Sequence, residues 1–247
     1  MAKKITVSLL IIFILLLAAQ IIFTYLGRRS EDNFFNSKLR PIAMKSAFLR
    51  KILVLHNDGD ARFEYLNNKI RIEVDAMENI KVNYEALELV KAKIMENVGN
   101  EASLLVSNAD IPYVEQTDEA AIEAIAKNYR NLPWTKSEAS LYILLVSRDK
   151  QDLDSLGLTF HEDGIIVYAN SHEDFTASNP KTYSNYIAST ILHEFGHQIG
   201  LPHNENKNCL MNTHAGEELV ARQSISEVIT DFCEYEKGQI KSLQQGY

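Results

Sequence analysis

Three histidines and one glutamate lie within eleven residues of this 247-residue chain, at spacings that a single metal ion can use. Residues 193–203 are HEFGHQIGLPH, which matches the pattern H-E-x-x-H-x-x-G-x-x-H. Zinc binds neutral imidazole nitrogens at about 2.0–2.1 Å, and three protein ligands leave a fourth position for water, as in catalytic zinc sites. The pattern therefore predicts one zinc ion bound by His193, His197 and His203.

Glu194 is the acid–base group of this pattern. Zinc lowers the pKa of a bound water towards about 7 and polarises a substrate carbonyl. A carboxylate beside the metal can take the proton of that water and later pass it to a leaving amine. We therefore predict peptide-bond hydrolysis by a zinc-bound water, with Glu194 as the general base and no covalent intermediate.

A helix over residues 182–199 is expected to position two of the ligands. Thr182 is a suitable N-cap residue, and an apolar residue recurs at every fourth position of the segment. At about 100° per residue, His193 and His197 fall together on roughly the opposite side, one turn apart. One face therefore packs on a core while the other presents two imidazoles. The apolar positions are Ile187, Ile191, Phe195 and Ile199.

Two glycines shape the chain around the motif. Gly196 is a poor helix former, at a cost of about 1 kcal/mol relative to alanine, so we expect another backbone to approach closely there. Gly200 is expected to end the helix as a left-handed residue. The turn that follows lets His203 swing back toward the metal.

The motif resembles that of the metzincin clan of zinc endopeptidases, whose signature continues to a methionine-containing turn. Met211 lies eight residues beyond His203 and matches this Met-turn. The resemblance implies that Met211 supports the ligand histidines from below without binding zinc. It also implies the zincin-like fold of the clan.

Two families within the clan remain open. The pattern 193–197 followed by Gly200 and Leu201 resembles matrixins. The spacing from His203 to Met211 resembles archaemetzincins.

Archaemetzincins carry a second, structural zinc on four cysteines, and this chain has only two. Cys209 and Cys233 match two of the positions, while Asn204 and Glu236 stand at the others. A complete four-cysteine zinc site is therefore not expected. The two cysteines either form a disulfide in its place or remain free thiols. A disulfide would close a loop of about 24 residues, worth roughly 3 kcal/mol, and would need an oxidising compartment.

Residues 69–247 alternate strand and helix patterns, which predicts an α+β fold with an α/β-like upper subdomain. We expect a twisted mixed sheet with helices on it, followed by the active-site helix, the Met-turn and a C-terminal helix. The resemblance implies that residues 165–168 are the antiparallel edge strand, which binds substrate by main-chain pairing. The predicted strands are residues 69–74, 102–106, 141–146, 157–160 and 164–169, and the other predicted helices are 83–98, 117–130 (capped by Thr117) and 224–243.

Residues 5–26 are almost entirely apolar and follow Lys3 and Lys4. Twenty-two helical residues span about 33 Å, enough to cross a bilayer. We predict an uncleaved anchor at 1–27, a stem at 28–68 and the catalytic domain at 69–247; a cleaved signal peptide is the alternative. The short basic head resembles an export signal and favours an extracytoplasmic catalytic domain, whereas the basic residues after the span favour the opposite orientation. We predict that the catalytic domain lies on the extracytoplasmic side.

The net charge of −8 argues against a nucleic-acid partner. The predicted function is a membrane-anchored zinc endopeptidase that acts on a peptide or protein substrate. Two alternatives remain: a catalytically weak or inactive scaffold that binds peptides, and a zinc hydrolase of another amide substrate. Specificity is expected to lie in residues 213–223. A second metal on His161, His172 and His214 is not expected, because scattered single histidines are more often surface residues.

Overall fold

The computed structural model describes residues 17–23, 34–35, 39–43, 46, 49, 52–53, 62–114, 118–132, 135, 138–147, 156–160, 163–169, 180–212 and 228–246. The chain separates into two compact units, Arg62–Gln244 on the one hand and Met1–Ala61 with Gln245–Tyr247 on the other. All the residues of the predicted zinc motif belong to the larger unit. The domain boundaries drawn from the sequence, at 27/28 and 68/69, stay predictions.

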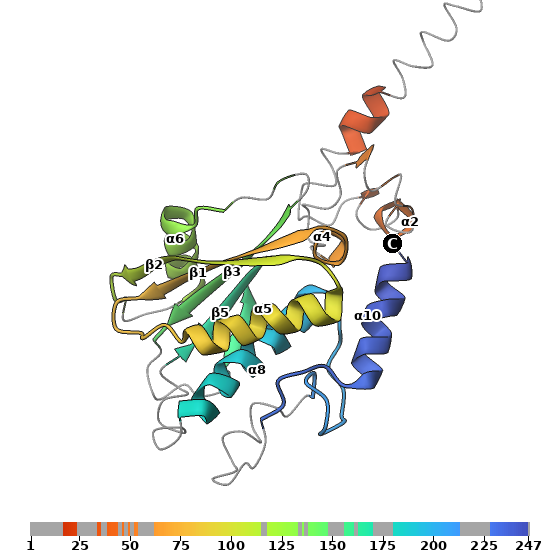
Figure 1. Cartoon of the computed structure of the whole chain (residues 1–247). Helices are drawn as coiled ribbons and strands as arrows, with labels where there is room; N and C mark the ends of the chain where they lie inside the picture. The colour runs from red at the N-terminus through yellow and green to blue at the C-terminus, as the bar shows by residue number, and fades with distance from the viewer. Residues whose placement is uncertain are drawn as a thin grey trace, which may run out of the picture. The chain divides into compact units, whose positions relative to one another are not determined.

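A five-stranded, mostly parallel sheet is the framework of the larger unit (Figure 1). The strand order is β2-β1-β3-β5-β4, and only β4 runs antiparallel to its neighbour. The central strand β3 is buried along almost its whole length, as its continuous apolar sequence predicts. The predicted mixed sheet is therefore confirmed. Its strands are β1 (Lys69–Met77), β2 (Ala102–Ile111), β3 (Glu138–Val146), β4 (Gly157–Phe160) and β5 (Gly164–Tyr168).

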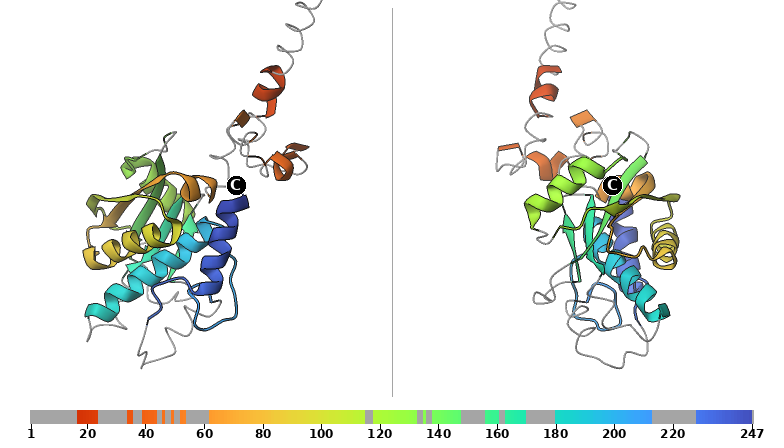
Figure 2. Two further views of the ribbon diagram at one scale, coloured as in Figure 1. Left: turned by 45° about the vertical axis from the view of Figure 1, so that its right-hand side comes forward. Right: turned by 90° about the vertical axis from the view of Figure 1, so that its left-hand side faces the viewer.

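Helices cover both faces of this sheet (Figures 1 and 2). Helices α5 (Tyr84–Val98) and α8 (Pro180–Gln198) pack side by side on one face, and α6 (Glu119–Tyr129) lies on the other. A short helix, α4 (Arg62–Asn67), precedes β1 and contacts β3. The strands and helices thus alternate along the chain in a mixed α/β arrangement.

Local capping explains where two of these helices begin. The Asn83 side chain accepts a hydrogen bond from the backbone N–H of Ala86 at the start of α5. The apolar stripe of α5 is buried, as its helical spacing predicts. Helix α6 is capped by Asp118, which accepts from the N–H of Ala121, so the predicted cap at Thr117 is wrong by one residue.

The edge strand predicted at residues 165–168 is wrong. These residues form β5, which pairs in parallel with β3 and is buried throughout. The 157–160 segment folds back on β5 as an antiparallel hairpin strand and makes β4 the outer strand. The inner strand is the more apolar of the two and is buried throughout, as expected for a strand whose two faces are both covered.

The C-terminal helix α10 (Glu234–Gly246) begins later than the predicted start at residue 224. Residues 224–227 lie outside the described part, but residues 228–233 are not helical. The first helical hydrogen bond runs from the Lys237 N–H to the Cys233 carbonyl. Because Cys233 is fixed by other contacts described below, the helix can start only after it.

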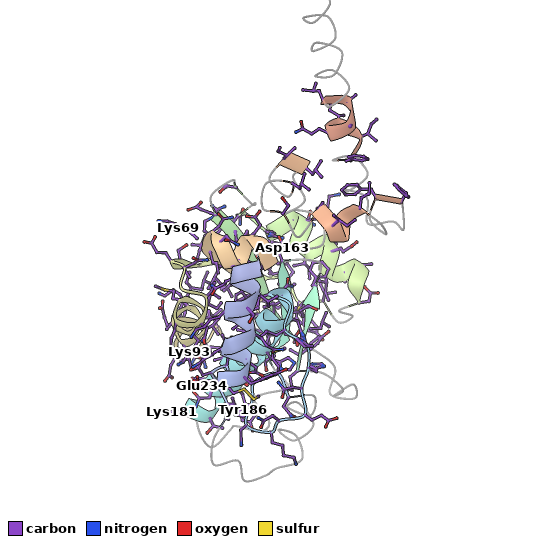
Figure 3. The ribbon with its side chains drawn as sticks, turned by 90° about the vertical axis from the view of Figure 1, so that its right-hand side faces the viewer. Lys69, Lys93, Asp163, Lys181, Tyr186 and Glu234 are labelled. Atoms are coloured by element: carbon purple, nitrogen blue, oxygen red, sulfur yellow. A yellow bond between two sulfur atoms is a disulfide. The ribbon has the colours of Figure 1, made fainter. Side chains whose placement is uncertain are left out.

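Asp231 joins the segment before α10 to α5, the helix on which Figure 3 labels Lys93. Its carboxylate accepts hydrogen bonds from Lys93 Nζ at 3.0 Å and from Asn97 Nδ2 at 2.9 Å, both on α5. Lys237 Nζ on α10 donates to the same carboxylate at 3.1 Å. One acidic side chain therefore joins the C-terminal segment to α5, one of the helices that cover the sheet.

The smaller unit has a small core of its own. Phe35, Ala43 and Leu53 are buried, and Phe23 stacks on Phe35 with ring centroids 5.4 Å apart. Of the predicted membrane span at residues 5–26, only 17–23 are described, and they are helical. Within the described residues, no helix combines the length and the apolar character that a bilayer crossing needs. The anchor stays a prediction.

Candidate metal centre

Helix α8 presents His193 and His197 on one face, as predicted. The helix begins at Pro180, two residues before the expected cap, where the fixed φ of proline suits a first turn. Both histidines are partly exposed, while the opposite stripe is buried. Packing of this apolar stripe against the core therefore fixes the position of the two imidazoles. Its members Ile187, Ile191, Phe195 and Ile199 are at most 2% exposed.

Gly200 ends α8 in the left-handed conformation, with φ 92°, as expected. The N–H of Gly200 donates to the His197 carbonyl at 2.9 Å, and the N–H of Leu201 donates to the Gly196 carbonyl at 2.8 Å. This pair of bonds is the Schellman arrangement of a helix C-terminus. It reverses the chain so that His203 returns to the face that carries the other two histidines.

The three histidines converge through their Nε2 atoms. His203 Nε2 lies 3.1 Å from His193 Nε2 and 3.0 Å from His197 Nε2. Two nitrogens bound tetrahedrally to one zinc ion would lie about 3.4 Å apart. Only a small outward movement of the rings separates the observed spacing from that value.

The hydrogen bonds of the Nδ1 atoms show which ring nitrogens face the point where the three histidines converge. His193 Nδ1 lies 2.8 Å from the Leu210 carbonyl, and His197 Nδ1 lies 3.1 Å from the Leu201 carbonyl. Because a carbonyl oxygen only accepts, both Nδ1 atoms must carry the proton. The Nε2 atoms of these two neutral rings therefore present lone pairs to one point. A cation fits this donor set.

Burial keeps these imidazoles neutral. It lowers the pKa of His193 to about 4, with the neighbouring His197 and His203 lowering it further and the bond to Leu210 opposing. Burial also lowers the pKa of His197. Neutral imidazole is the form that binds a metal ion.

Glu194 follows His193 on α8 and is 9% exposed. Burial raises the pKa of its carboxyl group to about 7, and a hydrogen bond from the backbone N–H of Thr159 opposes that rise. Thr159 belongs to β4, whose Gly157 leaves no room for a side chain, since a Cβ there would lie 2.6 Å from Thr190 Cγ2. Strand β4 therefore packs directly on α8 at Glu194. The sequence analysis missed this contact because it placed the edge strand elsewhere.

Met211 packs beneath α8 at Gly196. A Cβ at position 196 would lie 3.1 Å from Met211 Cε and 3.2 Å from Phe232 Cε1, and it would collide with Met211 Sδ. The glycine is thus required by a side chain, and the expected close approach of another backbone is wrong. Met211 is fully buried directly below the turn of helix that carries the metal-facing histidines.

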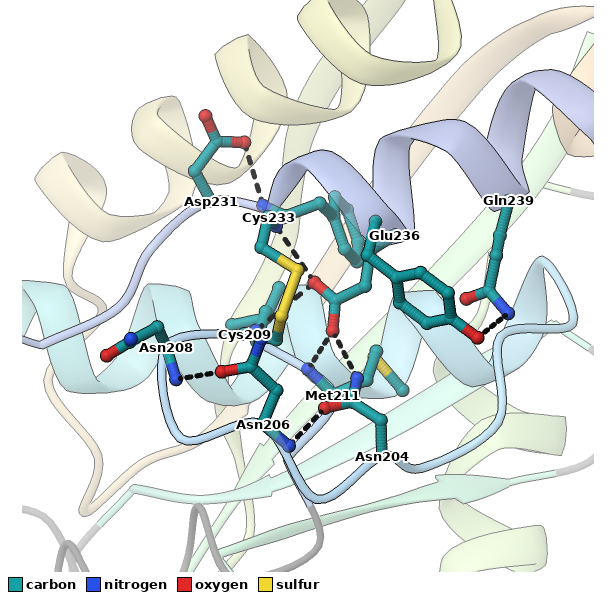
Figure 4. The surroundings of a disulfide bond; sticks show 12 residues. Asn204, Asn206, Asn208, Cys209, Met211, Asp231, Cys233, Glu236 and Gln239 are labelled. Atoms are coloured by element: carbon teal, nitrogen blue, oxygen red, sulfur yellow. Dashed lines mark hydrogen bonds between the residues drawn. A yellow bond between two sulfur atoms is a disulfide. The ribbon is translucent and has the colours of Figure 1, made fainter.

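Cys209 and Cys233 are joined by a disulfide, with an S–S distance of 2.07 Å and Cα atoms 5.0 Å apart (Figure 4). Of the two states left open by the sequence, the structure has the bridge. It connects the turn that contains Met211 to the residue before α10. Next to it, the buried Glu236 side chain accepts hydrogen bonds from the same turn. The sequence analysis noted Glu236 only as a missing cysteine.

Other residues of the prediction lie outside the described part of the chain. These are His161, His172, His214 and the 213–223 segment. Among the described residues, two groups of side chains have metal-ligand geometry: the three histidines, and Cys209 and Cys233 with Glu236. The sulfurs of the second group are bonded to each other, so they are not thiolate ligands.

The fold and the histidine site together define a zinc metallopeptidase. The sequence model of peptidase family M54 matches residues 50–234, and the chain belongs to this family. Zinc is accordingly confirmed as the cofactor, and so is the resemblance to archaemetzincins. No curated protein matches the chain in sequence.

Solved structures with a similar fold include archaemetzincins. The archaemetzincin of Methanopyrus kandleri superposes with a TM-score of 0.52 at 18% identity, over 73% of this chain and 97% of that one. The archaemetzincin of Archaeoglobus fulgidus complexed with malonate has a TM-score of 0.45 at 19% identity, over 69% and 99%. A zinc-dependent peptidase of Methanocorpusculum labreanum has a TM-score of 0.44 at 14% identity, over 69% and 99%. The first of these supports the mixed α/β fold.

Proposed function

We propose that the protein is a metzincin-type zinc endopeptidase in which His193, His197 and His203 hold the metal and Glu194 is the general base. The observation that carries this proposal is the convergence of three Nε2 atoms at 3.0 and 3.1 Å. The buried Glu194 carboxylate on the same helix adds the proton acceptor. Zinc, when bound there, supplies Lewis acidity toward a water molecule and a substrate carbonyl.

Glu194 performs the proton transfers of the reaction. Its carboxylate takes a proton from the attacking water and passes it to the amide nitrogen that leaves, so that no covalent enzyme intermediate forms. The Thr159 N–H holds this carboxylate in place. The 9% exposure of Glu194 limits the access of bulk water to the same oxygen atoms.

Strand β4 is the proposed binding edge for the substrate main chain. In the described part of the chain it is the outer strand of the sheet, the position at which an added strand can pair. Thr159 contacts Glu194 from this strand. A peptide added to β4 would therefore run past Glu194, which brings its amide bonds within reach of the acid–base group.

The proposed general base is tested by Glu194→Ala in the full chain. We expect this variant to keep stoichiometric zinc and to lose peptide cleavage by about 10²–10⁴-fold, measured on a peptide library with and without chelator. The matched control is Glu205→Ala, which removes an exposed glutamate just beyond His203. Full activity of Glu194→Ala would refute the role.

The same assay separates the alternatives. A wild-type protein that binds zinc and peptides without cleaving any would be the inactive scaffold. One that cleaves a non-peptide amide and no peptide would be the other zinc hydrolase. The retention of Glu194 at the histidine cluster favours the peptidase, because a scaffold would not need a proton acceptor there.

We also propose that residues 5–26 anchor the protein in a membrane, with the catalytic unit on the extracytoplasmic side. The apolar run supports the anchor, and a disulfide suits an oxidising compartment. Extraction with alkaline carbonate should leave the full chain in the membrane fraction, and protease added outside should reach the catalytic unit. Release into the supernatant would contradict the anchor.

A further inference from the structure

The carboxylate of Glu236 is a buried acceptor for four hydrogen bonds (Figure 4). The side chain is 0% exposed and projects from α10 into the turn that contains Met211. The donors are the N–H groups of Met211 at 2.7 Å, Cys233 at 3.0 Å and Leu210 at 3.2 Å, and Asn204 Nδ2 at 2.9 Å.

These four bonds use the whole hydrogen-bonding capacity of the group. A carboxylate has about four lone-pair sites and no hydrogen to donate. A buried polar group is costly unless its partners are present. Because each donor belongs to a different residue, loss of the carboxylate leaves four buried or partly buried N–H groups without an acceptor.

One pair of bonds leads to His193. The Leu210 N–H donates to Glu236, and the Leu210 carbonyl accepts the proton of His193 Nδ1 at 2.8 Å. The N–H group of Leu210 is thus bound to Glu236, and its carbonyl group is bound to His193. The position of Glu236 therefore determines where His193 finds the acceptor that orients its ring.

A second pair leads to His203, through the residue that follows it. Asn204 donates its side-chain amide to Glu236, and its backbone N–H donates to the Met211 carbonyl at 2.8 Å. The Met211 N–H in turn donates a hydrogen bond to Glu236. This closed set of bonds fixes the chain directly after His203, which has no helix to hold it.

We propose that Glu236 is a positioning residue of the zinc site: it sets the geometry of His193 and His203 without touching the metal. Groups that orient metal ligands typically change metal affinity or activity by about 10–100-fold when they are altered. The inference rests on the proposed three-histidine site. It adds a residue of α10 that lies 33 positions beyond His203 in sequence.

A purely structural role for Glu236 makes a different prediction. Its bond to the Cys233 N–H is the side-chain half of a capping box, with Cys233 at the helix N-cap. If capping were its whole role, a variant would be less stable and would bind zinc as the wild type does.

The test is Glu236→Gln in the full chain, because glutamine keeps the shape and replaces one acceptor oxygen with a donor. The zinc dissociation constant is measured by chelator competition on the metal-free protein, and the site geometry by the visible absorption spectrum of the Co²⁺ form. We expect zinc binding to weaken by about 10–100-fold and the Co²⁺ bands to shift. The matched control is Glu234→Gln, which changes an exposed glutamate in the same turn of α10 and should match the wild type (Figure 3).

Folded Glu236→Gln that binds zinc within twofold of the wild type, with an unchanged Co²⁺ spectrum, would overturn the inference. If Glu236→Gln does not fold, Asn204→Ala replaces it, because this change leaves the carboxylate with its three backbone donors. We expect Asn204→Ala to weaken zinc binding through His203, and wild-type affinity in that variant would also overturn the inference. A wild type that binds no zinc at the histidines would instead refute the proposed function.

Discussion

Replacing Gly196 by alanine tests the packing that supports the histidine helix. In an open helix this change is stabilising by about 1 kcal/mol, because alanine has the higher helix propensity. At position 196 we expect the opposite sign. The reason is that the added methyl group points into Met211 and the Phe232 ring.

The magnitude follows from the contacts of the added methyl group. It would lie 3.1 Å from Met211 Cε and 3.2 Å from Phe232 Cε1, and closer than 3.0 Å to Met211 Sδ, whereas ordinary carbon contacts are about 3.5–4.0 Å. Met211 is 0% and Phe232 2% exposed, so neither can move into solvent. Overpacking of this severity costs about 2–3 kcal/mol. After the gain in propensity, a net loss of about 1–2 kcal/mol remains.

Thermal unfolding of the metal-free protein measures this loss. For a domain of about 150–250 residues, each kcal/mol shifts Tm by about 2–4 °C, so Gly196→Ala should melt about 2–8 °C lower. Combining it with Met211→Ala gives a double-mutant cycle. The two changes should couple by at least about 1 kcal/mol, because the smaller residue leaves room for the methyl group.

Gly238→Ala is the matched control. Gly238 lies within α10, and a Cβ there would meet no atom within 4 Å. This variant should gain up to about 1 kcal/mol from propensity alone. If Gly196→Ala also melted at or above the wild-type temperature, the close contact between Met211 and α8 would be refuted.

Three further predictions concern the metal, the disulfide and a buried acid. His203→Ala should lose zinc, and stoichiometric metal by elemental analysis would contradict the three-histidine site. Replacing both Cys209 and Cys233 by serine opens a bridge with a sequence separation of 24. It should lower the free energy of unfolding by about 3 kcal/mol; an unchanged urea midpoint would count against this. Burial raises the pKa of Glu64 from 4.5 to about 7, so the folded protein retains a proton there that the unfolded chain releases, and stability falls as pH rises through this window. Glu64→Gln should therefore exceed the wild type by at least about 1 kcal/mol above about pH 7 and match it below about pH 4.5. A difference in stability between Glu64→Gln and the wild type that does not change with pH would refute the buried-acid reasoning.

The histidine helix could be predicted from the sequence because its signals are local. The apolar stripe, the two histidines one turn apart and the left-handed Gly200 all act within four or five residues of one another. Each is a property of helix geometry and needs no knowledge of the rest of the fold. For the same reason the predicted start of the 83–98 helix differs by one residue from the observed start of α5 at Tyr84, with Asn83 as its N-cap.

Strand β1 shows why other features could not be predicted. Alternation predicted its end at Val74, yet the strand continues to Met77 through Asp75. Asp75 and Glu73, which lies within the predicted part, are both 0% exposed. Burial of these acids depends on distant partners. Glu73 accepts the N–H groups of Asn131 and Leu132, and Asp75 accepts from Asn108 and Tyr142. No local pattern indicates which partners will come together.

The same limit applies around the candidate site. The neighbour of Gly196 is a methionine that arrives from a later turn, and Thr159 reaches Glu194 only because β4 takes the outer position of the sheet. The sequence indicated the identity of the chemical groups. Their supports depend on tertiary contacts between segments that lie far apart in the chain.

The residues that contact the turn at Met211 come from a segment that follows the histidine motif in sequence. Cys233 and Glu236 are made after every histidine of the motif, and both must be in place to hold the turn at Met211. Synthesis adds about 5–20 residues per second, so the N-terminal part of a chain is available for folding first. With Glu236 in its proposed positioning role, the histidine site takes its final geometry only after the 33 residues that follow His203 have also been synthesised.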